Sequence, residues 1–143
     1  MAMKYFQKQR LLKLADFLES LPRGRFDLSI IAKYGDNGNT PAEKGCGTAA
    51  CAIGWTPVVF PRACTYTPAL CGYERELSVV SKETGSIDFN FAEEFFGLNA
   101  AESNYLFMPD SYPESRRGKK SVAGRIRKFV AGNVPEEEIE AAW

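Results

Sequence analysis

The sequence contains no histidine among its 143 residues. This absence excludes the Ser-His and Cys-His nucleophile pairs, the His-Glu-x-x-His zinc site and the commonest general base near neutral pH. Any catalysis would depend on carboxylates, lysine, tyrosine or cysteine, whose ordinary pKa values lie far from 7 and need burial or charged neighbours to shift. The sequence therefore favours a protein without enzymatic activity.

Long apolar runs are also missing. No stretch approaches the roughly 20 apolar residues that cross a bilayer, and the N-terminus lacks the basic and apolar regions of a secretory signal. We therefore expect a soluble, cytoplasmic protein that does not associate with membranes. Its cysteines are too few and too clustered for a disulfide-stabilised scaffold, so in a reducing cytosol we expect free thiols. The cysteines are Cys46, Cys51, Cys64 and Cys71.

Length and composition are those of an ordinary globular domain. Apolar residues make up 45% of the chain and charged residues 25%, a balance that argues against wholesale disorder. A chain of this length buries one core, so we expect a single domain over residues 1–143. The spacing of the apolar residues predicts a mainly helical, α+β fold: a compact helical domain with a small β-hairpin.

Four segments have the spacing and the end signals of helices. They are residues 4–21, 90–97, 100–107 and 122–131. In the first, apolar side chains recur every three or four positions. Asn90 and Asn99 are each followed three positions later by Glu, the capping-box pattern that begins a helix. Gly97 is placed to end one helix, and Ser121 is placed to begin the last.

Three further predictions concern the middle of the chain. Residues 76–81 and 87–89 favour strand and flank a Thr-Gly-Ser turn, which predicts a β-hairpin. Residues 26–32 are apolar and few, so a short helix and a buried strand are both compatible, and we favour the helix. Residues 57–71 are rich in Pro, Thr and Ala, which predicts an irregular surface segment.

The segment CGTAACAIGW, residues 46–55, concentrates unusual residue types. We expect Thr48 to cap a helix that runs for about two turns and ends before Pro57. Cys51 would lie in its first turn, where the helix dipole lowers the pKa of a thiol. Three interpretations remain: a reactive Cys51 with Cys46 as resolving thiol, small side chains in a buried helix, and a zinc site. The cysteine spacing does not match the usual zinc pairs, so we expect no metal and no cofactor.

A basic cluster lies closer to the C-terminus. Seven Lys or Arg residues fall within residues 116–128, which contain no acidic residue. Such a cluster either binds an anion or forms a solvated basic face, and the acidic segment 136–140 could neutralise it. We consider an anion site that combines the cluster with backbone N–H groups at the expected helix start. The candidate ligand-binding residues are Gly47, Thr48, Arg116, Arg117, Lys119, Lys120, Arg125 and Lys128.

Several motifs resemble those of a family of small uncharacterised proteins from bacteria and their phages. The most specific is Cys46-Gly47-Thr48-x-x-Cys51-Ala52-Ile53-Gly54. Others are Arg10-Leu11-Leu12-x-Leu14-Ala15-x-Phe17-Leu18 and Phe95-Phe96-Gly97-Leu98. Similar proteins often carry His where this chain has Trp55. The resemblance implies a phage or mobile-element setting and no known activity.

We therefore expect a non-enzymatic binding protein that captures a protein partner or a small anionic ligand such as a nucleotide. The first alternative is a cysteine-dependent enzyme or redox sensor that uses Cys51 and Cys46. The second is a DNA-binding module, because residues 90–107 resemble part of a helix-turn-helix. Residues 99–108 carry no Arg or Lys to contact bases, so nucleic acid is not an expected partner. A homo-oligomer is compatible with the sequence.

Overall fold

The computed structural model describes residues 3–35, 38–43, 48–69 and 76–143. The α-helices are α1 (Tyr5–Ser20), α2 (Thr56–Val59), α3 (Phe89–Phe96), α4 (Ala100–Phe107), α5 (Lys119–Val130) and α6 (Glu136–Ala141). The strands are β1 (Ala32–Lys33), β2 (Ala49–Ala50), β3 (Cys64–Pro68) and β4 (Glu76–Ser81). Short 3-10 helices are η1 (Pro41–Glu43), η2 (Ile53–Trp55), η3 (Pro109–Ser111) and η4 (Glu114–Arg116). Helices make up 51% of the described residues, and the described strands form one small antiparallel sheet, so the fold is α+β, as predicted.

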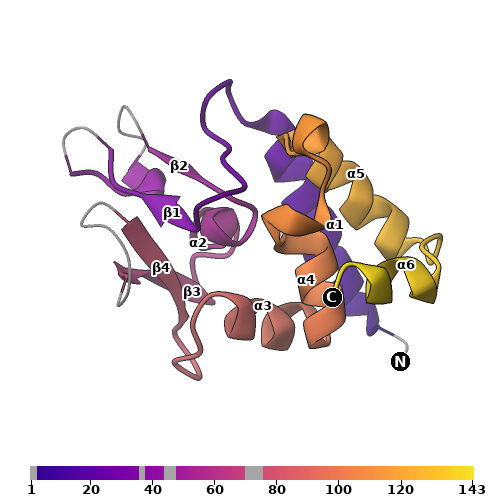
Figure 1. Ribbon diagram of the computed structural model, residues 1–143. Helices are drawn as coiled ribbons and strands as arrows, with labels where there is room; N and C mark the ends of the chain where they lie inside the picture. Colours follow the sequence, from indigo (N-terminus) through magenta and orange to yellow (C-terminus); the bar gives the residue numbers. More distant parts are fainter. Residues whose placement is uncertain (1–2, 36–37, 44–47, 70–75) are drawn as a thin grey trace.

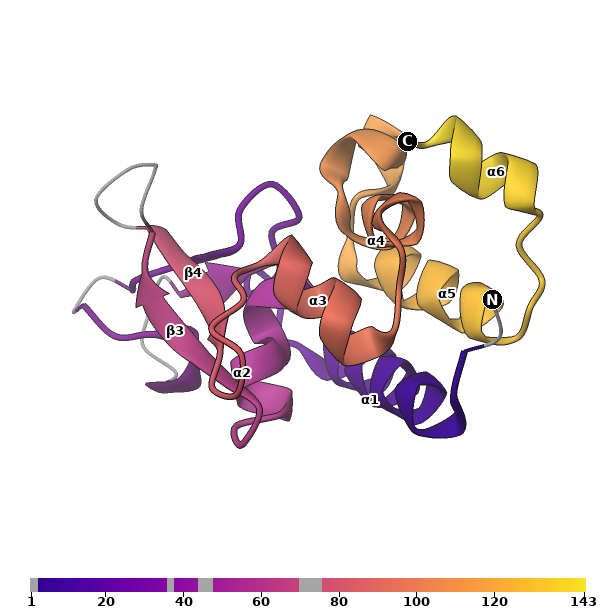
Figure 2. The ribbon, with the colours of Figure 1, turned by 90° about the horizontal axis from the view of Figure 1, so that it is seen from below.

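The sheet lies at one end of the molecule. Figures 1 and 2 show α1, α4, α5 and α6 at the other end, with α2 and α3 between them and the sheet. The strand order is β2-β1-β4-β3, and all neighbouring pairs are antiparallel. One cluster of buried apolar side chains includes residues of both ends, among them Leu77 and Val79 of β4 and Val122 and Ile126 of α5. The sheet and the helices therefore share a core. Within the described ranges, no helix is both long and apolar enough to cross a membrane.

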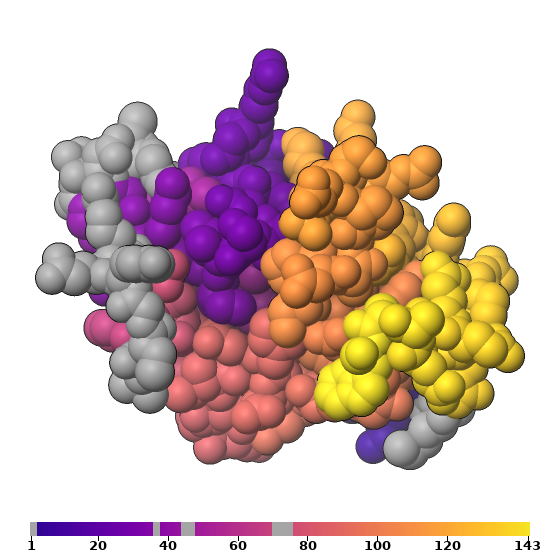
Figure 3. Space-filling model, viewed as in Figure 1, coloured from indigo at the N-terminus to yellow at the C-terminus, as the bar shows by residue number. Residues whose placement is uncertain are grey.

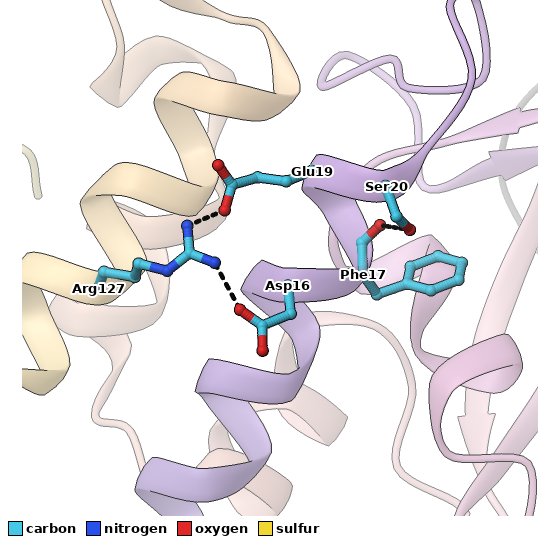
Figure 4. Close-up of polar contacts among 5 residues, drawn as sticks. All are labelled: Asp16, Phe17, Glu19, Ser20 and Arg127. Carbon is cyan, nitrogen blue, oxygen red and sulfur yellow. Dashed lines mark hydrogen bonds and ion pairs between the residues drawn. The ribbon is translucent and has the colours of Figure 1, made fainter.

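Helix α1 confirms the sequence prediction. It ends at Ser20, shortly before Pro22. Its buried side chains are Leu11, Leu14, Ala15 and Leu18. Helix α1 packs along α5, and Figure 4 shows Arg127 of α5 between two carboxylates of α1, those of Asp16 and Glu19. This packing fixes the position of α5 and of the basic residues that it carries.

The predicted break between α3 and α4 is also confirmed. Gly97 caps α3 in the left-handed conformation, with φ of 69°, which a residue without a Cβ adopts at little cost. The N–H of Glu102 donates to the Asn99 side chain at 2.8 Å. The N–H of Asn99 donates to the Glu102 carboxylate at 2.8 Å, which completes the capping box.

Two helices begin at residues other than those predicted. Asp88, and not Asn90, is the N-cap of α3, where its φ is 53° and its carboxylate accepts a hydrogen bond from the Val79 N–H at 2.8 Å. Helix α5 begins at Lys119, before the expected cap Ser121. The hydrogen bond from Val79 in β4 holds Asp88 in place. The start of α3 is therefore set by this contact with the sheet and not by the capping-box pattern at Asn90.

The sheet is larger than the predicted hairpin. Strand β4 matches the predicted 76–81 segment, but it pairs with β1 and β3. Ile87 makes an isolated bridge to Val80, and residues 87–89 form no strand. Strand β3 lies in the segment predicted to be irregular. Strand β3 is short and contains few apolar residues, so its own sequence predicts a strand only weakly. Pairing with β4 therefore determines the conformation of β3.

Residues 26–32 do not form the helix that the sequence analysis favoured. Phe26 makes a bridge to Ala50, and the Ala50 carbonyl accepts a hydrogen bond from the Asp27 N–H at 3.1 Å. The chain then enters β1 at Ala32. Long-range pairing with β2 therefore decides the conformation of this apolar segment.

The helix predicted after Thr48 is absent from the described part of segment 46–55. Ala49–Ala50 form β2, and Ile53–Trp55 form η2, which continues into α2. Pro57 lies in the first turn of α2 and does not end a helix, because a residue in the first turn needs no N–H donor. Thr48 is consequently not a helix cap.

Gly54 lies directly against the backbone that precedes β1. A Cβ at this position would lie 1.6 Å from the carbonyl oxygen of Ile31 and 2.6 Å from the Cβ of Ala50. Only a residue without a side chain allows this approach. Packing thus explains Gly54, one of the two glycines of the 46–55 segment.

We expect Gly54→Ala to destabilise the protein by about 3 kcal/mol or more, because the added methyl group overlaps backbone that cannot move away cheaply. Urea denaturation followed by circular dichroism measures the change in the free energy of unfolding. The matched control is Gly124→Ala in α5, where an added Cβ meets nothing within 4 Å. That substitution should be neutral or stabilising by up to about 1 kcal/mol. Equal stability of the two variants would contradict the packing role of Gly54.

Candidate functional site

Cys51 is buried, and its environment does not activate the thiol. The residue is 3% exposed, and burial raises the pKa of its thiol to about 12, although the N–H groups of Gly54 and Ile53 oppose the shift. The predicted lowering of the Cys51 pKa is therefore wrong, because no helix begins at Thr48. Cys64 is a second buried free thiol, and burial raises its pKa to about 11.

Some predicted site residues lie outside the described residues. These are Cys46, the expected resolving thiol, and Gly47, an expected ligand-binding residue. Cys71 lies outside them as well. In the parts of the chain that the structure describes, no three Cys, Asp or Glu side chains gather in a way that could hold a metal ion.

Thr48, the other residue expected at the start of an anion-binding helix, is fully buried. Its carbonyl accepts a hydrogen bond from Arg25 Nε at 2.8 Å, and Trp55 Nε1 donates to the Arg25 carbonyl at 3.1 Å. The Arg25 guanidinium also lies 5.4 Å from the centroid of the Trp55 ring. Thr48 adjoins β2, which Figure 1 places at the opposite end of the molecule from α5. The described part of the 46–55 segment and the basic cluster therefore do not form one site.

Part of the basic cluster holds the fold together. Arg127 binds the two carboxylates of α1. Lys119 Nζ donates to the carbonyl of Leu21 at the end of α1. Arg117 Nε donates to the carbonyl of Tyr112 at 3.2 Å. Arg117 and Lys119 were predicted to bind ligand. Their positions in the sequence gave no sign of these structural contacts.

The remaining four predicted cations line one groove, which we call the basic groove. They are Arg116, Lys120, Arg125 and Lys128. The groove has a volume of about 470 Å³ and includes Tyr105 of α4 and Glu138 of α6 in its lining. Figure 3 shows α6 and the end of the chain, in yellow, against the orange surface formed by α4 and its neighbours. These four predicted residues thus line one hollow, which lies away from the segment with which they were combined in the sequence analysis.

One face of α5 forms a wall of the basic groove. Lys120, Gly124 and Lys128 are four residues apart, so they lie on the same side of the helix. Glycine inside a helix costs about 0.5–1 kcal/mol relative to alanine. Packing does not require Gly124, since an added Cβ would meet nothing within 4 Å. The glycine leaves open space between the two lysines.

Arg125 is held rigidly in the wall of the groove. Its Nη1 atom donates to the Tyr105 and Ser111 carbonyls, at 2.9 Å each, and to Ser111 Oγ at 3.2 Å. Its guanidinium carbon lies 4.2 Å from the Tyr105 ring centroid and 3.7 Å from that of Tyr112. Its hydrogen bonds to Tyr105 and Ser111 all use Nη1, and its guanidinium also interacts with the Tyr112 hydroxyl. A guanidinium has five N–H donors, so these contacts leave donors for another acceptor.

The basic groove carries net positive charge. Four basic residues and one acidic residue, Glu138, line it, which gives a formal charge of +3. Glu138 accepts a hydrogen bond from the Tyr105 hydroxyl at 3.1 Å. The side chains of Arg116, Lys120 and Lys128 are exposed and form no hydrogen bond or ion pair with any other described residue. The acidic helix α6 therefore offsets only part of the charge.

The two tyrosines of the groove, Tyr105 and Tyr112, were not among the predicted site residues. The Tyr112 hydroxyl donates to the Leu106 carbonyl at 2.6 Å, which ties this residue to α4. The four-residue spacing of Lys120, Gly124 and Lys128 was a usable signal, whereas the position of Tyr112 was not visible in local sequence.

No protein-family model, curated protein sequence or solved structure matches the chain. The family resemblance of the 46–55 motif, and the phage or mobile-element setting that it implies, therefore stay predictions. The assignment of a site rests on the geometry of this molecule.

Cys51 and Cys64 should be unreactive in the folded protein. A pKa raised to about 12 or about 11 leaves each thiol protonated at neutral pH, and burial excludes the reagent as well. We expect iodoacetamide to label both residues at least about a hundredfold more slowly in the native protein than in urea. Mass spectrometry of the labelled peptides resolves each cysteine. Native labelling of Cys51 at the rate of the unfolded chain would instead support the cysteine-dependent alternative.

Proposed function

We propose that this chain is a single-domain, non-enzymatic binding protein that holds a small anionic ligand in the basic groove. One observation carries the proposal: three exposed cations without an internal partner surround a fourth, Arg125, whose position is fixed. A basic face that is only solvated requires neither a fixed arginine nor a hollow. Of the two partner classes expected from the sequence, a small anion fits this geometry better than a protein.

A phosphate or carboxylate group matches the donors that the groove offers. Arg125 keeps N–H donors beyond those on Nη1 for an acceptor, and a guanidinium can bind two oxygens of an anion in parallel. Lys120 and Lys128 supply mobile ammonium groups on the adjoining wall. Lys120 and Ser121 also lie in the first turn of α5, whose N-cap Gly118 has no side chain to satisfy the backbone N–H groups. These donors favour an anion at the same end of the groove.

The groove lacks a group suited to acid-base catalysis near neutral pH. Burial raises the pKa of Tyr105, and burial also raises the pKa of Tyr112, so both phenols stay protonated. Glu138 already accepts a hydrogen bond from Tyr105. Binding without chemical conversion of the ligand is therefore the function that this arrangement supports.

Inorganic phosphate, nucleoside monophosphates, nucleoside triphosphates and cyclic nucleotides test the proposal in a thermal-shift assay. A ligand present at about a hundred times its Kd adds roughly 2.7 kcal/mol to the free energy of unfolding, which raises the Tm by several degrees. We expect Lys120→Glu and Lys128→Glu each to weaken the shifting ligand about tenfold or more, because each replaces an attractive charge by a repulsive one.

The matched control is Arg23→Glu, a charge reversal at an exposed arginine that does not line the groove. It should keep both the wild-type Tm and the ligand-dependent shift. The absence of a shift with every anion would contradict the proposal. A shift that survives both lysine substitutions would place the ligand elsewhere.

A further inference from the structure

A second surface combines exposed aromatic rings with basic side chains. Two adjoining shallow hollows, of about 470 Å³ and about 400 Å³, lie along the outer side of α1 and the residues that follow α2. Tyr5 is 77% exposed and Phe6 is 48% exposed. We call this surface the aromatic face and define it by Tyr5, Phe6, Arg10, Lys13, Phe60 and Arg62. Large exposed aromatic residues in a cluster mark an interaction surface.

The cations of the aromatic face lie over the rings. The Arg10 guanidinium carbon is 4.8 Å from the centroid of Phe6 and 3.9 Å from that of Phe95. Its Nη1 donates to the Phe95 carbonyl at 2.7 Å. Lys13 Nζ lies 5.4 Å from the centroid of Phe60. Ring contacts thus position the charges beside the exposed aromatic surface.

The charge of the aromatic face has one sign. Arg10, Lys13 and Arg62 line the two hollows, and no acidic residue does so among the described residues, which gives a formal charge of +3. Arg10 and Arg62 also line a neighbouring hollow, together with Glu83 and Glu94. These carboxylates limit the positive surface on the side of β4 and α3. An anionic partner would therefore follow α1 and the residues Phe60 and Arg62, which line the same hollow as Arg10 and Lys13 of α1.

We propose that the aromatic face binds single-stranded nucleic acid. Such a strand complements both features of the surface. Its flat bases can stack on the exposed rings, and its phosphates can contact the cations. In the hollow over α1, which contains both exposed rings, every apolar lining residue is aromatic: Tyr5, Phe6 and Phe60. The adjoining hollow also has aliphatic lining residues, Val59, Pro61 and Ala63. The stacking argument therefore applies to the hollow over α1, where exposed aromatic rings and cations favour bases and phosphates over an acidic peptide.

This inference revises the sequence-based expectation that nucleic acid is not a partner. That expectation rested on residues 99–108, which carry no Arg or Lys, and this observation remains valid for that segment. In the sequence, Tyr5 and Phe6 lie in the first turn of the helix predicted over residues 4–21. Phe60 and Arg62 join them only through folding, across more than fifty positions of the chain. The inference is independent of the basic groove.

Fluorescence anisotropy with a labelled oligo-dT of about 15 nucleotides tests the proposal, since one such site covers roughly 4–16 nucleotides. We expect binding at low salt that weakens as salt rises, because each neutralised phosphate releases counterions. Tyr5→Ala and Phe6→Ala should each weaken binding about fivefold or more, as loss of one stacked base does. Lys13→Glu should weaken it about tenfold or more and reduce the salt slope. All three side chains are exposed, so circular dichroism should show an unchanged fold.

Two controls make the outcome decisive. Arg23→Glu reverses an exposed charge away from the face, and Trp143→Ala removes a side chain of a residue that is 73% exposed outside it. Both should bind oligo-dT like the wild type. The proposal fails if oligo-dT does not bind at low salt, or if the Tyr5 and Phe6 substitutions leave binding unchanged. Poly-glutamate binding in place of oligo-dT would identify an acidic protein as the partner and would likewise overturn it.

Discussion

The close approach of Gly54 to the Ile31 carbonyl is the constraint on which the sheet end of the molecule depends. It brings the 48–59 segment against β1, where the Cys51 N–H reaches the Ile30 and Ile31 carbonyls at 3.1 and 3.2 Å. The Tyr66 hydroxyl then donates to the Gly54 carbonyl at 2.5 Å and attaches β3 to the same point. Packing accounts for Gly54 and Cys51 without a chemical role. A side chain on Gly54 would separate the backbones, and a larger residue in place of the buried Cys51 would be overpacked.

The helical end of the molecule carries the surfaces available for binding, and α1 serves both of them. Its inner side packs along α5, where Arg127 and Lys119 connect the two helices and keep the basic groove in place. Its first turns display Tyr5 and Phe6 to solvent. Two sides of α1 therefore have different roles. Its buried leucines pack in the core beside α5, which forms a wall of the basic groove, and its exposed aromatic residues form the separate aromatic face.

Local signals in the sequence predicted what local interactions decide. Helix α1, the Gly97 stop and the Asn99 capping box each depend on neighbours within four residues, and all three are confirmed. Strands β2 and β3 were missed because pairing partners distant in sequence determine them. The error at Thr48 also shifted the expected pKa of Cys51 in the wrong direction. The cations of the groove were predicted because they cluster in sequence, whereas the rings around Arg125 and along α1 meet only in the folded chain.

The central claim is that anion binding belongs to the basic groove and that the Cys51 segment is structural. A titration of the isotope-labelled protein with inorganic phosphate, followed by amide chemical shifts in NMR, tests this claim most directly. We expect the shifts to concentrate on Lys120, Gly124 and Lys128, while the amides of Thr48 and Cys51 stay unchanged. Shifts centred on Thr48 and Cys51, with α5 unaffected, would contradict the account, and so would the absence of any phosphate-dependent shift.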